Sequence, residues 1–401
     1  MSVMALAILL AFAVYSLFSK SISKSILTLP ILFTALGLAL SQPLREAVPP
    51  AVADGAKVGL AEITLILLLF SDASRVRFRR LVLEWQIPAS MLVIGMPLTL
   101  ALGTAFAFWL NPASGLATAL LTAAVLTPTD AALGQSVVAS PDVPEHLGET
   151  INVESGLNDG LVFPIVLLSA MLASSALGDG GPGSLALDAL IEVILGPLAG
   201  IAVGWLSARA MDWAQDRGYM LESAGAVVFL VTAFAAYLLA DAIDGNGFMA
   251  AFVAGMVFGN TYRHAIHFIS EFMDGAGQLL TMSAFLVFGA FLLPDGLAHA
   301  GFSTVLLAVL FLTLVRVIPI VLSLTGSGLG LREKLFLGWF GPRGLASILF
   351  TLLMMDQFDL PGEDALLACV SLTVFLSILL HGMSSAPLAR RIGFDEARRD
   401  E

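Results

Sequence analysis

Residues 127–134 read TPTDAALG and place a proline and an aspartate inside an apolar stretch that runs from about 115 to 139. The stretch is long enough to cross a bilayer, because a spanning helix needs about 20 mostly apolar residues. Pro128 removes a backbone donor and clashes with the preceding turn, so the helix is predicted to break there. The break would leave Thr129 and Asp130 beside freed backbone groups at mid-membrane.

A second interruption follows seven spans later. Residues 341–347 read GPRGLAS, with two glycines and a proline around Arg343. Two broken helices at matching places in two halves of a chain are typical of a transporter site built on inverted repeats. The alternative is a pair of ordinary proline kinks.

The composition supports a membrane protein throughout the chain. Of 401 residues, 58% are hydrophobic and 12% charged, whereas a soluble domain has about 25% charged residues. We therefore expect an all-α polytopic membrane protein with about 13 transmembrane helices, two of which (spans five and twelve) are interrupted. Residues 1–401 then form a single transporter domain with a cytoplasmic tail from about 387. The predicted spans are 3–18, 25–41, 58–71, 86–110, 115–139, 150–175, 184–209, 221–240, 245–260, 276–294, 300–324, 333–355 and 363–386.

The distribution of basic residues predicts the orientation. With the N-terminus outside and the C-terminus in the cytoplasm, 15 of the 19 Lys and Arg residues lie on the cytoplasmic side, as the positive-inside rule requires. The first 18 residues have no basic leader and are read as a first span rather than a removed signal peptide. A single cysteine, Cys369, excludes a disulfide framework, and no basic stripe with interleaved aromatics indicates a nucleic-acid partner.

Span six carries the sequence NVESGLNDG at 152–160. A spacing of four places Glu154 and Asn158 on one stripe of a helix, and Ser155 and Asp159 on the next. A hydroxyl and a carboxylate that point the same way offer hard oxygen ligands for Na⁺ or Li⁺. The carboxylate can bind a proton instead.

Five charged residues are predicted to lie deep in the membrane: Asp130, Glu154, Asp159, Arg316 and Arg343. Charges there are costly and mark functional sites. Three carboxylates and two guanidiniums, which do not deprotonate, leave a net charge of −1. One monovalent cation or one proton would neutralise it. Glu154 is interpreted as the structural partner of Arg316 or Arg343, and Asp159 as the carboxylate that binds the ion.

Five segments resemble the monovalent cation:proton antiporters of the NhaP/NHE type. They are LLLFSDASRVRFRR at 67–80, TPTD at 127–130, VESGLND at 153–159, GFMAAFVAGMVFGN at 247–260 and GPRGLAS at 341–347. The resemblance covers essentially the whole chain, and the motifs follow one another in the family's order.

The resemblance implies a homodimer in which each protomer has an interface subdomain and a moving core subdomain, interleaved along the chain. It also implies that spans five and twelve are partly unwound and cross each other. It implies that Asp159 binds the cation and the proton. The supporting or ligating residues would be Asp130, Thr129, Ser155 and Glu154, with Na⁺ held by Asp159, Ser155, Asp130 and Thr129. Asn158 stands where electrogenic relatives carry a second aspartate, so the resemblance implies one-for-one exchange. Arg316 and Arg343 would hold Glu154 and balance helix ends.

The expected function is therefore a secondary antiporter that exchanges Na⁺ or Li⁺ for H⁺ in a bacterial or archaeal plasma membrane, without a cofactor. A K⁺/H⁺ antiporter of the same fold is the alternative, because the side-chain chemistry does not separate these cations. An intramembrane aspartyl protease, which needs a paired aspartate dyad, and a cation channel, which needs a pore lined by charge or carbonyl rings, are remote alternatives.

Overall fold

The computed structural model describes residues 2–22, 27–76, 86–130, 133–134, 137, 140, 142–174, 182–221, 223–264 and 267–397. Every regular element in these ranges is a helix. The α-helices are α1 (Ser2–Ile22), α2 (Leu29–Ala39), α3 (Ser41–Ala47), α4 (Pro50–Arg75), α6 (Gln86–Ser90), α7 (Met96–Leu110), α8 (Gly115–Val125), α10 (Glu145–Ala173), α11 (Pro182–Asp216), α12 (Ala224–Asp241), α13 (Gly247–Thr261), α14 (His267–Val287), α15 (Leu293–Ala298), α16 (Phe302–Leu312), α17 (Leu314–Ser323), α18 (Leu331–Trp339), α19 (Leu345–Gln357) and α20 (Glu363–Ala397). Two π-helical segments, Met91–Gly95 and Phe288–Leu292, and a 3-10 turn, Pro112–Ser114, connect some of them.

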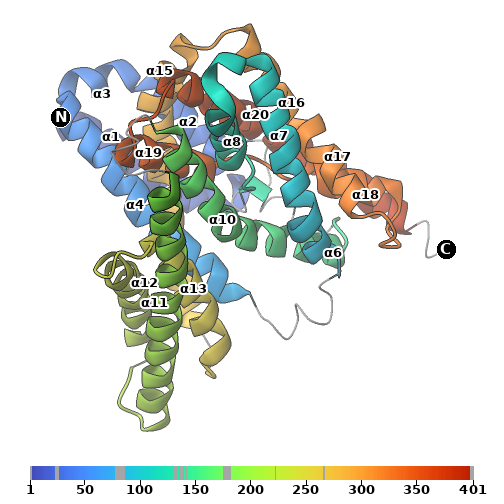
Figure 1. Cartoon of the computed structure of the whole chain (residues 1–401). Coiled ribbons are helices and arrows are strands. Elements are labelled where there is room, and N and C mark those ends of the chain that lie inside the picture. The colour runs from blue at the N-terminus through green and yellow to red at the C-terminus, as the bar shows by residue number, and fades with distance from the viewer. Residues whose placement is uncertain are drawn as a thin grey trace.

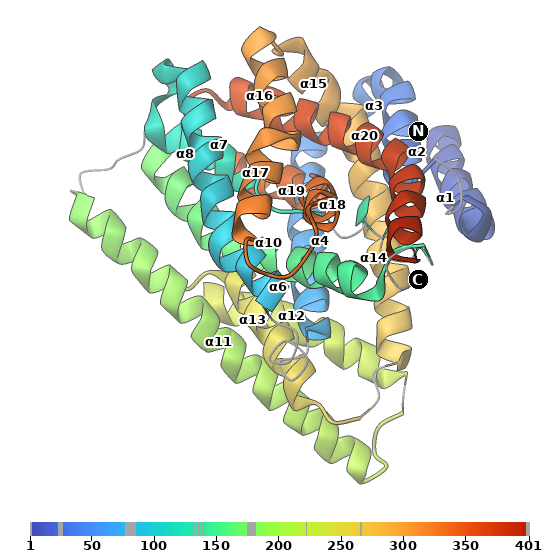
Figure 2. The ribbon, with the colours of Figure 1, turned by 90° about the vertical axis from the view of Figure 1, so that its right-hand side faces the viewer.

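The helices form a bundle whose centre holds the predicted site. Figure 1 shows α11, α12 and α13 together on one side and α16, α17 and α18 on the other, with α10 between them. In Figure 2 the long helix α11 runs along one edge of the bundle, while α18 and α19 lie near its centre. The residues around both interruptions, 121–130 and 340–350, are all buried.

Seven helices within the described ranges are long and apolar enough to cross a membrane, and five shorter apolar helices accompany them. The seven are Gln86–Leu110, Glu145–Ala173, Ile191–Asp216, Ala224–Asp241, Glu271–Ala298, Phe302–Ser323 and Glu363–Gly393. Each of the 13 predicted spans contains helix, although part of 115–139 lies outside the described residues. The number 13 itself stays a prediction.

The ends of several helices differ from the sequence-based expectation. The polar segment 141–149 lies outside the predicted spans but contributes its last five residues to α10. The polar segment 261–275 also lies outside the predicted spans and includes the first turns of α14, which continues into the next span. The predicted tail continues α20 as far as Ala397. In all three cases a helix extends beyond its apolar stretch into polar residues, because hydropathy alone does not mark where a helix begins or ends.

Close backbone contacts hold α13 against its neighbours. A side chain on Gly255 or Gly259 of α13 would clash with carbonyl oxygens of α4, at Phe70 and Ser74. Small residues spaced by four let helix backbones approach closely in a membrane, where hydrophobic burial contributes little to helix association. Helix α4 is thereby fixed beside α13, and α10 packs against both.

Both predicted interruptions are present. Helix α8 ends at Val125 and is followed by non-helical residues up to Asp130, while α18 ends at Trp339 and α19 begins at Leu345. A third interruption was not predicted: α16 and α17 are separated at Thr313, whose backbone angles are φ −120° and ψ −94°. It lies three residues before Arg316.

Candidate ion-binding site

The two interruptions meet at the centre of the bundle. The backbone N–H of Asp130 donates to the carbonyl oxygen of Pro342, 2.8 Å away. Backbone groups that the helices leave unpaired at each break therefore find a partner in the other break, which is what a low-dielectric interior demands. The crossing of the two broken helices follows from this contact.

Each break also contains a charged side chain that binds the end of a helix next to the other break. The guanidinium of Arg343 donates to the carbonyl oxygens of Thr127 and Pro128, just after the C-terminal end of α8. The Asp130 carboxylate accepts from the backbone N–H of Leu345, the first residue of α19, at 2.6 Å. A cation at a helix C-terminus and an anion at a helix N-terminus are both stabilising. Arg343 therefore lies at the end of α8, and Asp130 lies at the start of α19.

Asp130 is thus occupied by backbone groups. Its second oxygen accepts from the N–H of Leu133 at 3.1 Å, and a side chain on Gly344 would clash with the carboxylate. The sequence suggested Asp130 as a ligand of the ion, and this stays a prediction. In the structure both carboxylate oxygens accept hydrogen bonds from backbone N–H groups, those of Leu345 and Leu133.

Glu154 forms a buried ion pair with Arg316. Both of its oxygens accept from the guanidinium, at 2.6 and 2.7 Å, and both side chains are less than 5% exposed. The sequence left Arg316 and Arg343 open as partners, and the geometry selects Arg316. Gly341 is required beside this pair, because a side chain there would clash with the guanidinium of Arg316.

Thr129, Ser155 and Asn158 form a compact polar cluster. The Asn158 side-chain amide donates to Thr129 Oγ1 at 2.6 Å, and the hydroxyls of Thr129 and Ser155 are 3.0 Å apart. All three residues are buried. The first break is therefore tied to α10 by the residue types that the sequence singled out.

Asp159 lies one helical turn after Ser155 and is only 6% exposed. Its Oδ1 has no hydrogen-bond partner among the described residues, and neither has Oδ1 of the adjacent Asn158. Buried polar atoms are normally paired. Two unpaired oxygens on consecutive residues, beside the hydroxyl cluster, are the kind of arrangement that a proton or a cation would satisfy.

Asp72 is a nearby carboxylate that directly follows the predicted span 58–71. It lies in the last turn of α4, where a Cβ on Gly156 of α10 would be 3.9 Å from the Asp72 Cβ. The predicted span ended at residue 71, but α4 continues to Arg75. No sequence pattern reveals this proximity, because it depends on how α4 packs on α10.

The matched family model covers residues 6–391 and describes a sodium/hydrogen exchanger, transmembrane. The chain belongs to the sodium/hydrogen exchanger family. Family membership and the apolar helices make it an integral membrane protein.

Relatives and solved structures agree with this assignment. The chain is 27% identical over 334 residues to the K(+)/H(+) antiporter NhaP2 of Shewanella oneidensis. The aligned region covers 82% of this chain and 57% of the relative. It is 26% identical over 372 residues to Na(+)/H(+) antiporter 2 of Zygosaccharomyces rouxii, covering 83% and 45%. The chain thus spans about half the length of these curated relatives. The solved structure of the sodium proton antiporter MjNhaP1 from Methanocaldococcus jannaschii matches with a TM-score of 0.77 at 20% identity, over 98% of this chain and 97% of that one; this likeness shows a shared fold.

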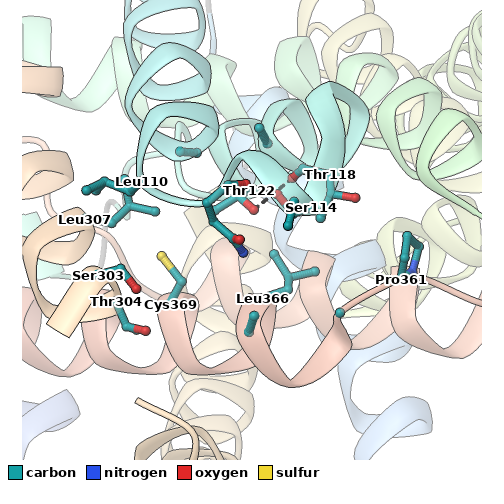
Figure 3. Close-up of a pocket in the computed structure, with 16 residues that line it drawn as sticks. Leu110, Ser114, Thr118, Thr122, Ser303, Thr304, Leu307, Pro361, Leu366 and Cys369 are labelled. Carbon is teal, nitrogen blue, oxygen red and sulfur yellow. Dashed lines mark hydrogen bonds between the residues drawn. The ribbon is translucent and has the colours of Figure 1, made fainter. Parts of the chain in front are cut away.

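A separate cavity of about 340 Å³ lies away from the site of this exchanger-family chain. Figure 3 shows hydroxyl groups of Ser114, Thr118 and Thr122 on one wall, with Cys369 on α20 facing Leu307 and Thr304. No Asp, Glu, Lys, Arg or His is among the 16 residues that line it. The cavity therefore contains none of the predicted ion-binding residues.

Proposed function

We propose that this chain is a secondary antiporter that exchanges Na⁺ or Li⁺ for H⁺ by competition of the two ions for Asp159. The observation that carries the proposal is the buried, unpaired Oδ1 of Asp159 beside the Thr129–Ser155–Asn158 cluster. A carboxylate, hydroxyls and an amide carbonyl are oxygen donors suited to hard monovalent cations.

The arrangement of charges supports a single exchangeable site. Glu154 is balanced by Arg316 within one ion pair, while Asp130 and Arg343 have opposite charges and each binds a helix end. The net charge of −1 that the sequence predicts for the core is then left on Asp159. One cation or one proton neutralises it, and the binding of one excludes the other.

Thr129 and Ser155 are proposed as cation ligands together with Asp159, and Asn158 as the residue that orients Thr129. Asp130 is proposed to support the site by fixing the crossing of the breaks. Arg316 and Arg343 act in the same supporting way, through Glu154 and through the end of α8. The proposed ligands therefore contact the cation, whereas the supporting residues hold the helix breaks in place.

The same geometry argues against the remote alternatives. An aspartyl protease needs two aspartates that share a proton, whereas Asp130 accepts hydrogen bonds from Leu345 and Leu133. A channel needs an open pore, whereas Asp159 and its neighbours are buried. We therefore propose a transporter in a prokaryotic plasma membrane, with the N-terminus outside and the C-terminus in the cytoplasm, that works as a homodimer.

K⁺/H⁺ exchange is a second candidate, because the relative from Shewanella oneidensis carries that name. Reconstitution of the purified chain in liposomes that contain a pH-sensitive dye tests both. Na⁺ and Li⁺ gradients are expected to drive proton movement more effectively than an equal K⁺ gradient. Dominant K⁺-driven movement would replace the Na⁺ proposal, and the absence of cation-driven proton movement with all three ions would refute antiport.

A further inference from the structure

Helix α20 presents two buried polar side chains to the second break, one helical turn apart. Ser377 is fully buried and His381 is 2% exposed. The backbone N–H of Arg343 donates to Ser377 Oγ at 2.7 Å. His381 Nε2 lies 2.9 Å from the carbonyl oxygen of Trp339, the last residue of α18. Ser377 therefore contacts the break at Arg343, and His381 contacts it at Trp339, where the break begins.

The polar contacts of His381 connect Ser377 with the end of α18. A carbonyl oxygen only accepts, so His381 Nε2 carries a hydrogen and donates it to Trp339. In a neutral imidazole, Nδ1 is then an acceptor for the hydroxyl of Ser377, 3.2 Å away, while the backbone carbonyl oxygen of Ser377, 3.0 Å from the same nitrogen, makes no hydrogen bond with it. Ser377 accepts from Arg343 and donates to His381, and His381 donates to Trp339. The hydrogen bonds form a continuous chain around residues 339–343.

The second break is in turn connected to the proposed ion site. Pro342 accepts from the backbone of Asp130, and Arg343 donates to the carbonyl of Pro128. The next residue, Thr129, is bonded to Ser155 and Asn158. A shift of residues 339–343 would therefore displace Thr129 relative to Asp159.

We propose that His381 and Ser377 are positioning residues for cation binding: they hold the second break in the shape that places Thr129 against Ser155 and Asn158 of α10. This role rests on the proposed antiport activity, since it acts through that ion site. Neither side chain touches the ion. Their loss is expected to weaken cation affinity more than the maximal rate of exchange.

Four variants test the proposal. His381→Phe removes both hydrogen bonds but keeps a ring beside the Trp339 indole, whose centroid is 5.2 Å from that of His381. His381→Gln retains an N–H donor for Trp339. Ser377→Ala removes the acceptor of the Arg343 amide. Ser385→Ala is the matched control, because Ser385 is a buried serine of the same helix whose hydroxyl, among the residues that the structure describes, donates to the carbonyl oxygen of Gly382 within α20.

Two measurements are made on each variant reconstituted in lipid. The first is the apparent KM for Na⁺ and the maximal rate of exchange. One buried hydrogen bond is worth about a five- to tenfold change in affinity, so His381→Phe and Ser377→Ala should raise KM by about that factor. The control should stay close to wild type, and His381→Gln should lie between. The second is hydrogen–deuterium exchange of the backbone amides of residues 340–346, which should accelerate in His381→Phe and Ser377→Ala alone.

An unchanged KM in both His381→Phe and Ser377→Ala would overturn the positioning role, and so would an equal rise in Ser385→Ala. Unaltered amide exchange in the break would also overturn it, whether or not the chain transports ions. A wild-type chain without cation-driven exchange would refute the proposed function instead. In that case the hydrogen–deuterium exchange alone tests whether Ser377 and His381 stabilise residues 339–343.

Discussion

Glu154 and Asp159 lie five residues apart in one helix and are both buried, but their surroundings differ. Glu154 has a guanidinium on both oxygens, at 2.6 and 2.7 Å. Asp159 has an oxygen without a partner in the part of the chain that the structure describes. Burial alone therefore does not mark an ion-binding carboxylate. What distinguishes the two is whether the protein itself supplies the compensating charge.

The largest expected effect concerns Asp159. Among the five charged residues counted in the core, Asp159 is the one left without an opposite charge, so exchange by Asp159→Asn should fall to the level of liposomes without protein. The melting temperature in detergent should be unchanged or higher, because a neutral amide costs less to bury than a carboxylate. Na⁺-dependent proton movement by the purified variant would refute the assignment.

Glu154 should behave in the opposite way. Glu154→Gln leaves Arg316 as a buried charge without its partner, which typically costs about 3–5 kcal/mol. Thermal unfolding in detergent should show a clear loss of stability. The double variant Glu154→Gln/Arg316→Gln should recover part of it, because it removes both charges. An unchanged melting curve combined with lost cation binding would make Glu154 a ligand.

A smaller loss of stability is expected when a neighbouring residue, rather than Glu154 or Arg316 itself, is replaced. Gly341→Ala places a methyl group where it clashes with the Arg316 guanidinium. Overpacking of this kind typically costs about 1–3 kcal/mol, and the rigid pairing with Glu154 limits how far Arg316 can move. Gly277→Ala on α14 is the control, because nothing lies within 4 Å of a Cβ there. Equal melting temperatures for the two variants would show that the pair tolerates the displacement.

The sequence predicted the elements of this site better than their contacts. Pro128 and the Gly341–Pro342–Gly344 group break helices for local reasons, so both interruptions were predictable. The spacing of four in span six also predicted the faces of α10. The partner of Glu154, the helix-end role of Asp130 and the contacts of His381 depend on how distant helices cross. Nothing in the local sequence encodes those distances.

No effect is expected from an imposed voltage. If Asp159 is the one group that exchanges a cation for a proton, no net charge crosses the membrane in a cycle. A potassium–valinomycin potential across the liposomes should neither accelerate nor retard Na⁺/H⁺ exchange. A rate that follows the voltage would reveal a second titrating group, and Asp72, which packs beside α10, would be the first to replace with Asn.

Competition between Na⁺ and H⁺ at Asp159 is tested most directly by the apparent KM for Na⁺ as a function of pH in liposomes. Protons occupy the carboxylate more fully as the pH falls, so KM should rise toward tenfold for each pH unit on the acidic side. The maximal rate at saturating Na⁺ should remain constant over that range. A constant KM with a maximal rate that falls on acidification would contradict competition for one carboxylate.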